Sequence, residues 1–215
     1  NEDSLLFWTV SKIAPPQQRK LGELFGRWAL ARYGSLERAS DAWGQAAVEG
    51  DDPEEGVLAL YPIYEATEDQ TGGKAARVAD QVQFLTDTMR TFNLEMLRYL
   101  REELGCPQLV AAENWRTADQ SRLLDCERYA YSACEVIAKN HYFGGAHVGP
   151  KVGYAVEEGD LLTHRSVLTE PWEFPAGMKQ VAGHPHIITE CAWTNPNLYQ
   201  AEGPFLVAAY QSLAG

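Results

Sequence analysis

Apolar residues recur with helical spacing along the first half of the chain. After two prolines, the apolar positions of 15–33 recur every three or four residues, which predicts a helix that Gly34 ends. Ser35 is a suitable N-cap for a short second helix through Trp43. A third helix is predicted over 75–104, where seven apolar residues form one continuous stripe: Val78, Val82, Leu85, Met89, Phe92, Met96 and Leu100.

Short apolar runs alternate with further helical segments in the second half. The runs 108–112, 136–138 and 186–190 have the length and composition of buried parallel strands. Helices are expected at about 118–133, 175–182 and 204–213. This alternation predicts an α/β fold with a parallel sheet and right-handed crossover connections.

Polar and aromatic residues cluster just after the predicted strands. Glu113, Asn114 and Trp115 follow the first, Asn140, His141 and Tyr142 the second, and Glu190 and Trp193 the third. An α/β barrel carries its chemistry at this end of the strands, and an open doubly wound sheet does so at a switch point. No Gly-rich phosphate loop leads from a strand into a helix, which disfavours a nucleotide site.

Composition narrows the class of ligand. The chain has 215 residues, 45% of them hydrophobic, which is enough for one domain with a substantial core. A net charge of −12 argues against nucleic acid and is compatible with neutral substrates such as sugars. No apolar run is long enough to cross a membrane, and the histidines and cysteines form no metal-binding motif. We therefore expect no metal and no cofactor. The sequence leaves open whether the chain forms a homo-oligomer.

The order of these motifs resembles clan A glycoside hydrolases, which are (β/α)8 TIM barrels. In that clan the acid/base Glu follows an Asn at the end of the fourth strand, and the nucleophilic Glu ends the seventh. Asn1-Glu2 and Thr189-Glu190 match these two motifs. Asn140-His141-Tyr142 resembles the end of the sixth strand, where a Tyr or His commonly lies beside the nucleophile.

A longer segment is similar to family 42 β-galactosidases. Residues 32–44, which read RYGSLERASDAWG, resemble that family's signature kYGtleaLNeAWG. The resemblance implies that residues 1–215 are one catalytic barrel segment, incomplete at both ends and running from the end of strand four to helix seven. The chain departs from the family in Asp3, which follows the acid/base, and in lacking the cysteine-rich metal cluster of some members. These departures favour β-glycosidase as the broader expectation.

The resemblance implies a retaining double displacement on an oligo- or polysaccharide. Glu190 would be the nucleophile and Glu2 the acid/base, with their carboxyl groups about 5–5.5 Å apart. A hydrogen bond from Tyr142 would favour the ionised form of Glu190. Asn1 would bind the sugar 2-hydroxyl, which contributes most in the transition state.

The remaining candidates each have a structural alternative. Trp115 and Trp193 would stack on sugar rings or pack in the core. Asn114 would line a subsite or, with Glu113, cap the following helix. His141 would donate a hydrogen bond in the site or serve only the fold. A non-catalytic carbohydrate-binding barrel, in which stacking survives but the acid pair does not work, is the alternative function.

Overall fold

The computed structural model describes residues 4–144, 147–148, 157–194 and 196–214. The chain divides into two compact units, one ending at Ile137 and the other beginning at Ala138. Each unit has its own arrangement of elements. Asn1 and Glu2, two of the predicted site residues, lie outside the described residues.

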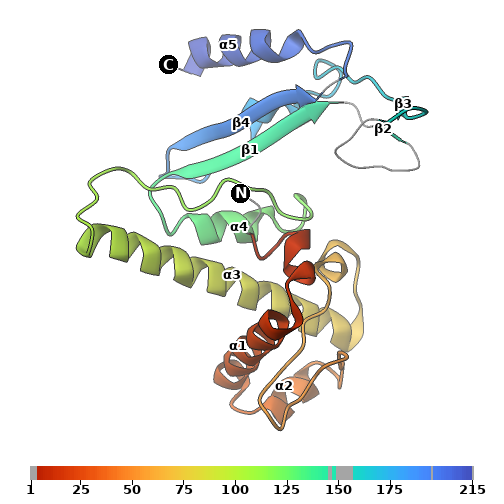
Figure 1. The fold of residues 1–215 in the computed structure, drawn as a ribbon, viewed down its shortest axis with the longest axis vertical. Helices are drawn as coiled ribbons and strands as arrows, with labels where there is room; N and C mark the ends of the chain where they lie inside the picture. Colours follow the sequence, from red (N-terminus) through yellow and green to blue (C-terminus); the bar gives the residue numbers. More distant parts are fainter. Residues whose placement is uncertain (1–3, 145–146, 149–156, 195, 215) are drawn as a thin grey trace. The chain divides into compact units, whose positions relative to one another are not determined.

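The first unit is helical (Figure 1). Its helices are η1 (Trp8–Lys12), α1 (Pro15–Tyr33), α2 (Leu36–Ala42), η2 (Ile63–Thr67), α3 (Gly72–Glu102) and α4 (Leu124–Tyr131). The predicted boundaries of the first two α-helices are confirmed. Gly34 ends α1 in the left-handed region, with φ of 81°, and the Ser35 side chain accepts the backbone N–H of Arg38 at the start of α2.

Three aromatic rings from separate elements form the centre of this unit. Phe25 of α1 stacks on Trp43 with ring centroids 5.7 Å apart and meets Phe84 of α3 at 5.1 Å. The indole N–H of Trp43 donates to the Asp80 carboxylate of α3 at 2.8 Å, and the Tyr33 hydroxyl donates to the same oxygen. The Tyr and Trp of the signature-like segment 32–44 therefore attach that segment to α3.

The predicted apolar stripe of α3 is covered over only part of its length. Val78, Leu85 and Met89 are buried, whereas Phe92 and Met96 are 54% and 40% exposed. The helix itself is confirmed, and it begins three residues earlier than expected, at Gly72. The helical period thus predicted the face correctly but could not show where packing against that face ends.

The predicted helix over 118–133 is shorter than expected. Its first turn is replaced by a side-chain turn, in which the Asp119 carboxylate accepts the backbone N–H groups of Ser121 and Arg122. Thr117 donates to the carbonyl of Asp119 and does not cap a helix. The predicted strand 108–112 is represented by one parallel bridge, between Ala111 and Val136.

The second unit, which begins one residue into β1, contains the two-stranded sheet of β1 (Ile137–Gly144) and β4 (His186–Thr194). Figure 1 draws both arrows pointing the same way, so the pair is parallel. The unit also holds β2 (His147–Val148), β3 (Leu161–Leu162), η3 (Pro171–Glu173), η4 (Pro175–Gly177) and α5 (Glu202–Ala214). β2 and β3 pair antiparallel.

The helix predicted at 175–182 is wrong. Only η4 forms there, and the backbone turns extended at Met178, with φ of −57° and ψ of 144°. Gly177 lies inside the segment and Gly183 follows it, so the local helix propensity is too low to extend the turn. An eight-stranded barrel stays a prediction, since among the described residues the parallel pairing comprises β1 with β4 and the Ala111–Val136 bridge.

Candidate functional site

Two neighbouring strands of the second unit bring predicted site residues together. The Tyr142 hydroxyl on β1 donates a hydrogen bond to the Glu190 carboxylate on β4. Nearby, the Thr189 hydroxyl donates to the side-chain carbonyl of Asn140 at 2.6 Å. The two strands are therefore joined by two side-chain contacts, and Glu190 is held from the neighbouring strand.

An aromatic cluster packs against the same pair of strands. Phe143 and Trp193 meet at 5.7 Å, and Phe174 meets Trp193 at 6.2 Å, in a cluster that also contains Val167. Successive side chains of a strand point to opposite faces, so Phe143 and Tyr142 lie on different sides. Phe143 therefore packs in this core, whereas Tyr142, on the other side of β1, is half-buried.

Trp193 belongs to that core in this structure. Its ring is 5% exposed, and a Cβ added to Gly203 at the start of α5 would lie 2.7 Å from it. Such a separation is too short for any side chain, so only glycine lets the α5 backbone approach the indole. This arrangement corresponds to the packing alternative for Trp193.

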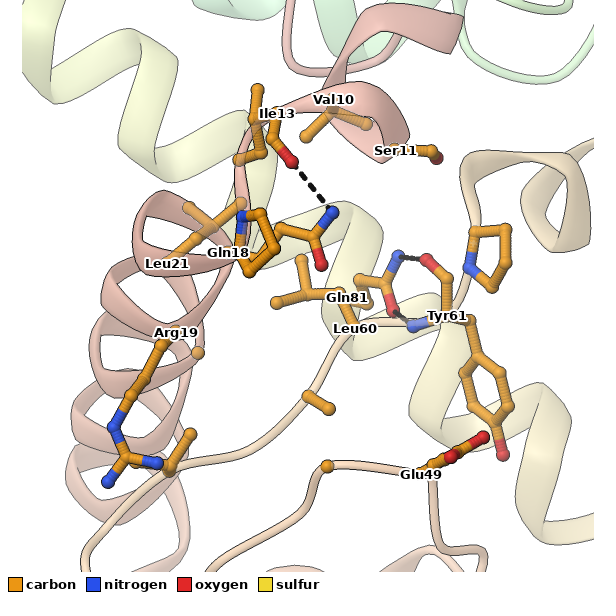
Figure 2. A pocket seen from close by; sticks show the side chains of 16 residues that line it. Val10, Ser11, Ile13, Gln18, Arg19, Leu21, Glu49, Leu60, Tyr61 and Gln81 are labelled. Atoms are coloured by element: carbon orange, nitrogen blue, oxygen red, sulfur yellow. Dashed lines mark hydrogen bonds between the residues drawn. The ribbon is translucent and has the colours of Figure 1, made fainter.

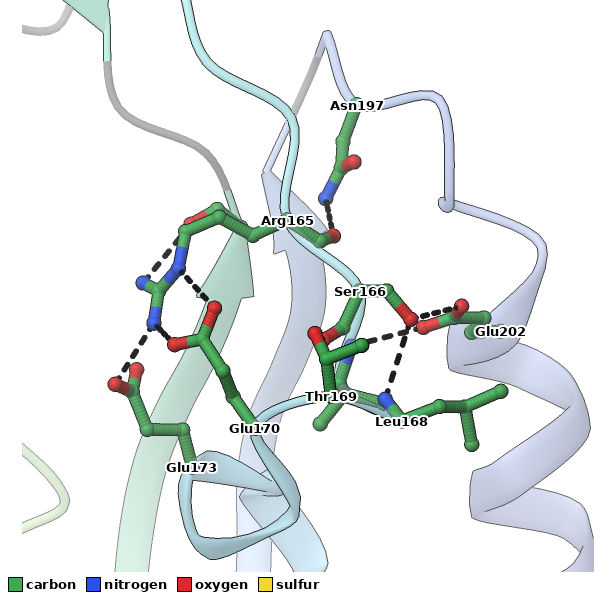
Figure 3. A network of polar contacts seen from close by, with 10 residues as sticks. Arg165, Ser166, Leu168, Thr169, Glu170, Glu173, Asn197 and Glu202 are labelled. Atoms are coloured by element: carbon green, nitrogen blue, oxygen red, sulfur yellow. Dashed lines mark hydrogen bonds and ion pairs between the residues drawn. The ribbon is translucent and has the colours of Figure 1, made fainter.

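Arg165 holds part of the segment between β1 and β4 in place through several contacts (Figure 3). The Arg165 guanidinium binds the Glu170 carboxylate and donates to Glu173 at 2.7 Å. It also lies over the Phe143 ring at 5.1 Å and donates to the Gly144 carbonyl at 3.4 Å. The hydrogen bonds that Arg165 donates to Glu170 and Glu173 raise the pKa of Arg165, so the group stays charged.

A second contact anchors that segment to α5. The Ser166 hydroxyl donates to the Glu202 carboxylate at 2.6 Å, and the Val167 backbone N–H donates to its other oxygen at 2.9 Å. Asn197 donates to the Arg165 carbonyl at 3.0 Å. The sequence indicates these residues only indirectly, because a long polar segment between two strands needs polar contacts of its own to hold it in place.

The predicted residues of the first unit lie next to α4. Glu113 accepts a hydrogen bond from the Tyr131 hydroxyl at 3.1 Å, and Trp115 meets Phe7 edge-on at 5.6 Å. Asn114 is half-buried between them. None of these side chains caps α4, since that helix begins at Leu124.

His141 is half-buried in β1, beside Tyr142. Asn140, for which the sequence predicts no separate role, contacts Thr189, a residue distant in sequence. Within the described ranges, no three or more His, Cys, Asp and Glu side chains gather as a metal site. No helix of the described residues is both long enough and apolar enough to cross a bilayer.

Comparison of the chain with protein-family models, with curated proteins and with solved structures gives no significant match.

Proposed function

We propose that the protein is a retaining β-glycoside hydrolase acting on β-galactosides or related saccharides. The observation that carries the proposal is the hydrogen bond from Tyr142 on β1 to Glu190 on β4. A carboxylate on a strand, oriented by a phenol from the adjacent parallel strand, is suited to attack a sugar carbon. The proposal also rests on the resemblance of Asn1-Glu2 and Thr189-Glu190 to the two carboxylate motifs of clan A.

The first chemical step forms a covalent bond between Glu190 and the sugar. A Glu190 carboxylate oxygen attacks the anomeric carbon, and the bond from that carbon to the leaving oxygen breaks. Glu2 gives its proton to the leaving oxygen, so the aglycone departs as an alcohol. The sugar is then held as an ester of Glu190, and Glu2 is ionised.

The second step returns the enzyme to its starting state. Ionised Glu2 takes a proton from water, and the water oxygen attacks the anomeric carbon. The ester bond to Glu190 breaks, which releases the sugar with its original β configuration. Two inversions at the same carbon account for net retention.

Tyr142 is proposed as a positioning residue for the nucleophile. Its O–H donates to one oxygen of Glu190 and thereby restricts rotation of the carboxylate. Asn1, Asn114, Trp115 and His141 are proposed to contact the sugar. The Phe143–Trp193 contact supports the strands that carry Tyr142 and Glu190.

The test is hydrolysis of an activated aryl β-galactoside by the full-length protein. Glu190→Ala is expected to remove turnover, and added azide is expected to restore it with a glycosyl azide as product. Glu2→Ala is expected to lose turnover most severely on substrates with poor leaving groups. Glu158→Ala, at an exposed position of the second unit, is the matched control. Wild-type rates in both Glu190→Ala and Glu2→Ala would overturn the proposal.

A further inference from the structure

The first unit contains a cavity of about 330 Å³ beside the start of α1 (Figure 2). It lies among the segment 10–13, the first turns of α1 and the loop 49–62. This volume falls at the lower end of the range of small-molecule sites, about 300–1,000 Å³. All of its lining residues belong to the first unit.

Gln81 braces one wall of the cavity. This α3 side chain is 1% exposed, and its amide forms both of its hydrogen bonds with the backbone of Tyr61, from Nε2 to the carbonyl at 2.9 Å and to Oε1 from the N–H at 2.8 Å. Figure 2 shows the pair as two parallel dashed lines. A buried amide satisfied in this way fixes the position of the Tyr61 backbone.

Arg77 braces the same wall from one turn earlier on α3. It is 2% exposed, donates to the carbonyls of Ala46 and Ala59 at 2.7 and 2.8 Å, and binds both carboxylate oxygens of Asp51. These contacts hold the loop on both sides of Glu49. Two buried polar side chains are thus committed to the backbone around one cavity, which preorganises its wall.

The rim of the cavity carries hydrogen-bonding groups of both kinds. Gln18 donates from Nε2 to the Ile13 carbonyl at 2.8 Å and keeps its amide oxygen as an acceptor. Arg19 is exposed and lies 3.9 Å from its nearest carboxylate, Asp52. Glu49 is exposed, and its carboxylate has no hydrogen bond or ion pair among the described residues. The rest of the lining includes apolar side chains such as Leu21 and Leu60.

This combination selects against charged ligands. An anion attracted by Arg19 meets Glu49 and a protein of net charge −12, and a cation attracted by Glu49 meets Arg19. A sugar hydroxyl donates to Glu49 or Gln18 and accepts from Arg19, while its C–H surface covers the apolar lining. We propose that this cavity binds a neutral polyhydroxylated molecule of about one sugar residue. The proposal does not depend on hydrolysis at Glu190.

Hydrogen-exchange mass spectrometry of the full-length Glu190→Gln protein tests this locally. Galactose, glucose and lactose are the probes, with glucuronate and glucosamine as charged analogues. We expect a neutral sugar to slow exchange in peptides covering 46–62. Glu49→Ala is expected to weaken that protection about tenfold in sugar concentration, the cost of one charged hydrogen bond. Gln18→Trp, which fills the mouth from an exposed helix position, is expected to abolish it.

Glu55→Ala removes a charge from the same loop without touching the cavity, and it should leave protection unchanged. No protection with any neutral sugar would overturn the proposal. So would protection that survives both Gln18→Trp and Glu49→Ala, or tighter binding of glucuronate or glucosamine. Loss of turnover in Glu190→Ala together with any of these results leaves the hydrolase proposal standing while this one fails.

Discussion

The hydroxyl of Tyr142 donates a hydrogen bond to the carboxylate of Glu190 across two parallel strands. These residues are far apart in sequence, and only pairing of β1 with β4 brings them together. The contact orients Glu190 from β1. The next residue of β1, Phe143, packs against Trp193. The position of the proposed nucleophile therefore depends on core packing as well as on one hydrogen bond.

Tyr142→Phe is expected to lower kcat on an aryl β-galactoside by about 10–100-fold, the rate equivalent of one hydrogen bond to a charged group. The ring remains, so the fold should be unchanged. The measurement is steady-state kinetics on the full-length protein, with circular dichroism as the check on folding. Tyr129→Phe, on an exposed tyrosine of α4, is the control. Equal kcat in wild type and Tyr142→Phe would show that Tyr142 does not position the nucleophile.

Asp80→Ala is expected to destabilise the first unit by about 2–5 kcal/mol, because the Trp43 indole N–H and the Tyr33 hydroxyl both lose their acceptor. Urea denaturation provides the measurement. Glu95→Ala, at an exposed position of the same helix, should change the unfolding free energy by less than about 0.5 kcal/mol. A similar small change for Asp80→Ala would mean that segment 32–44 is not held by this network.

Asp51 should make the protein sensitive to acid. Burial acts to raise its pKa, but the hydrogen bonds from Arg77 and from the backbone N–H groups of Val48 and Ala59 outweigh burial, so the pKa is lowered. A lowered folded-state pKa gives stability that is present above the unfolded value, about 3.9 for Asp, and is lost as pH falls through the folded value. Asp51→Asn should cost about 3–5 kcal/mol at pH 7, because it leaves Arg77 buried without its anion.

The measurement is the unfolding free energy of wild type and Asp51→Asn as a function of pH. The difference between the two proteins should shrink from about pH 5 down to about pH 2. Asp69→Asn is the control, since Asp69 pairs with Arg122 but its side chain is 93% exposed. A difference that stays constant with pH would show that the Arg77–Asp51 pair is not the source of the effect.

Gly26→Ala tests the close approach of α1 to the loop after α2. Helix propensity alone favours Ala over Gly by about 1 kcal/mol. A Cβ at Gly26 would lie 2.0 Å from the Gly56 carbonyl oxygen, so we expect a net loss of about 1–3 kcal/mol in thermal or urea unfolding. Gly22→Ala should cost less, because its Cβ would lie 3.0 Å from the Leu58 carbonyl oxygen. Stabilisation by Gly26→Ala would contradict this packing.

Local chemistry predicted part of the fold well. Gly34 and Ser35 mark helix boundaries by their own backbone and side-chain preferences, and both act as expected. The start of the helix predicted over 118–133 does not follow this logic, since the Asp119 carboxylate accepts two backbone N–H groups and so competes with the first turn of a helix. The spacing of apolar residues along the sequence does not reveal such competition.

The long-range contacts could not be predicted from the sequence. Asn140, His141 and Tyr142 were expected after a strand and instead lie inside β1, because pairing with β4 extends the strand. Asp80 gave no signal of its own, since its partners Tyr33 and Trp43 are on other elements. The candidate site was predicted as motifs from a resemblance, and among the described residues the contact of Tyr142 with Glu190 brings two of its predicted members together.

The most direct measurement is mass spectrometry of the full-length protein after incubation with a 2-deoxy-2-fluoro β-galactoside that carries a good leaving group. The fluorine slows release of the sugar ester more than its formation. We predict one covalent fluorosugar, located by peptide mapping on Glu190, and no label in Glu190→Gln. A label on a different carboxylate, or hydrolysis of the unfluorinated substrate with no label at all, would contradict the assignment of Glu190 as the nucleophile.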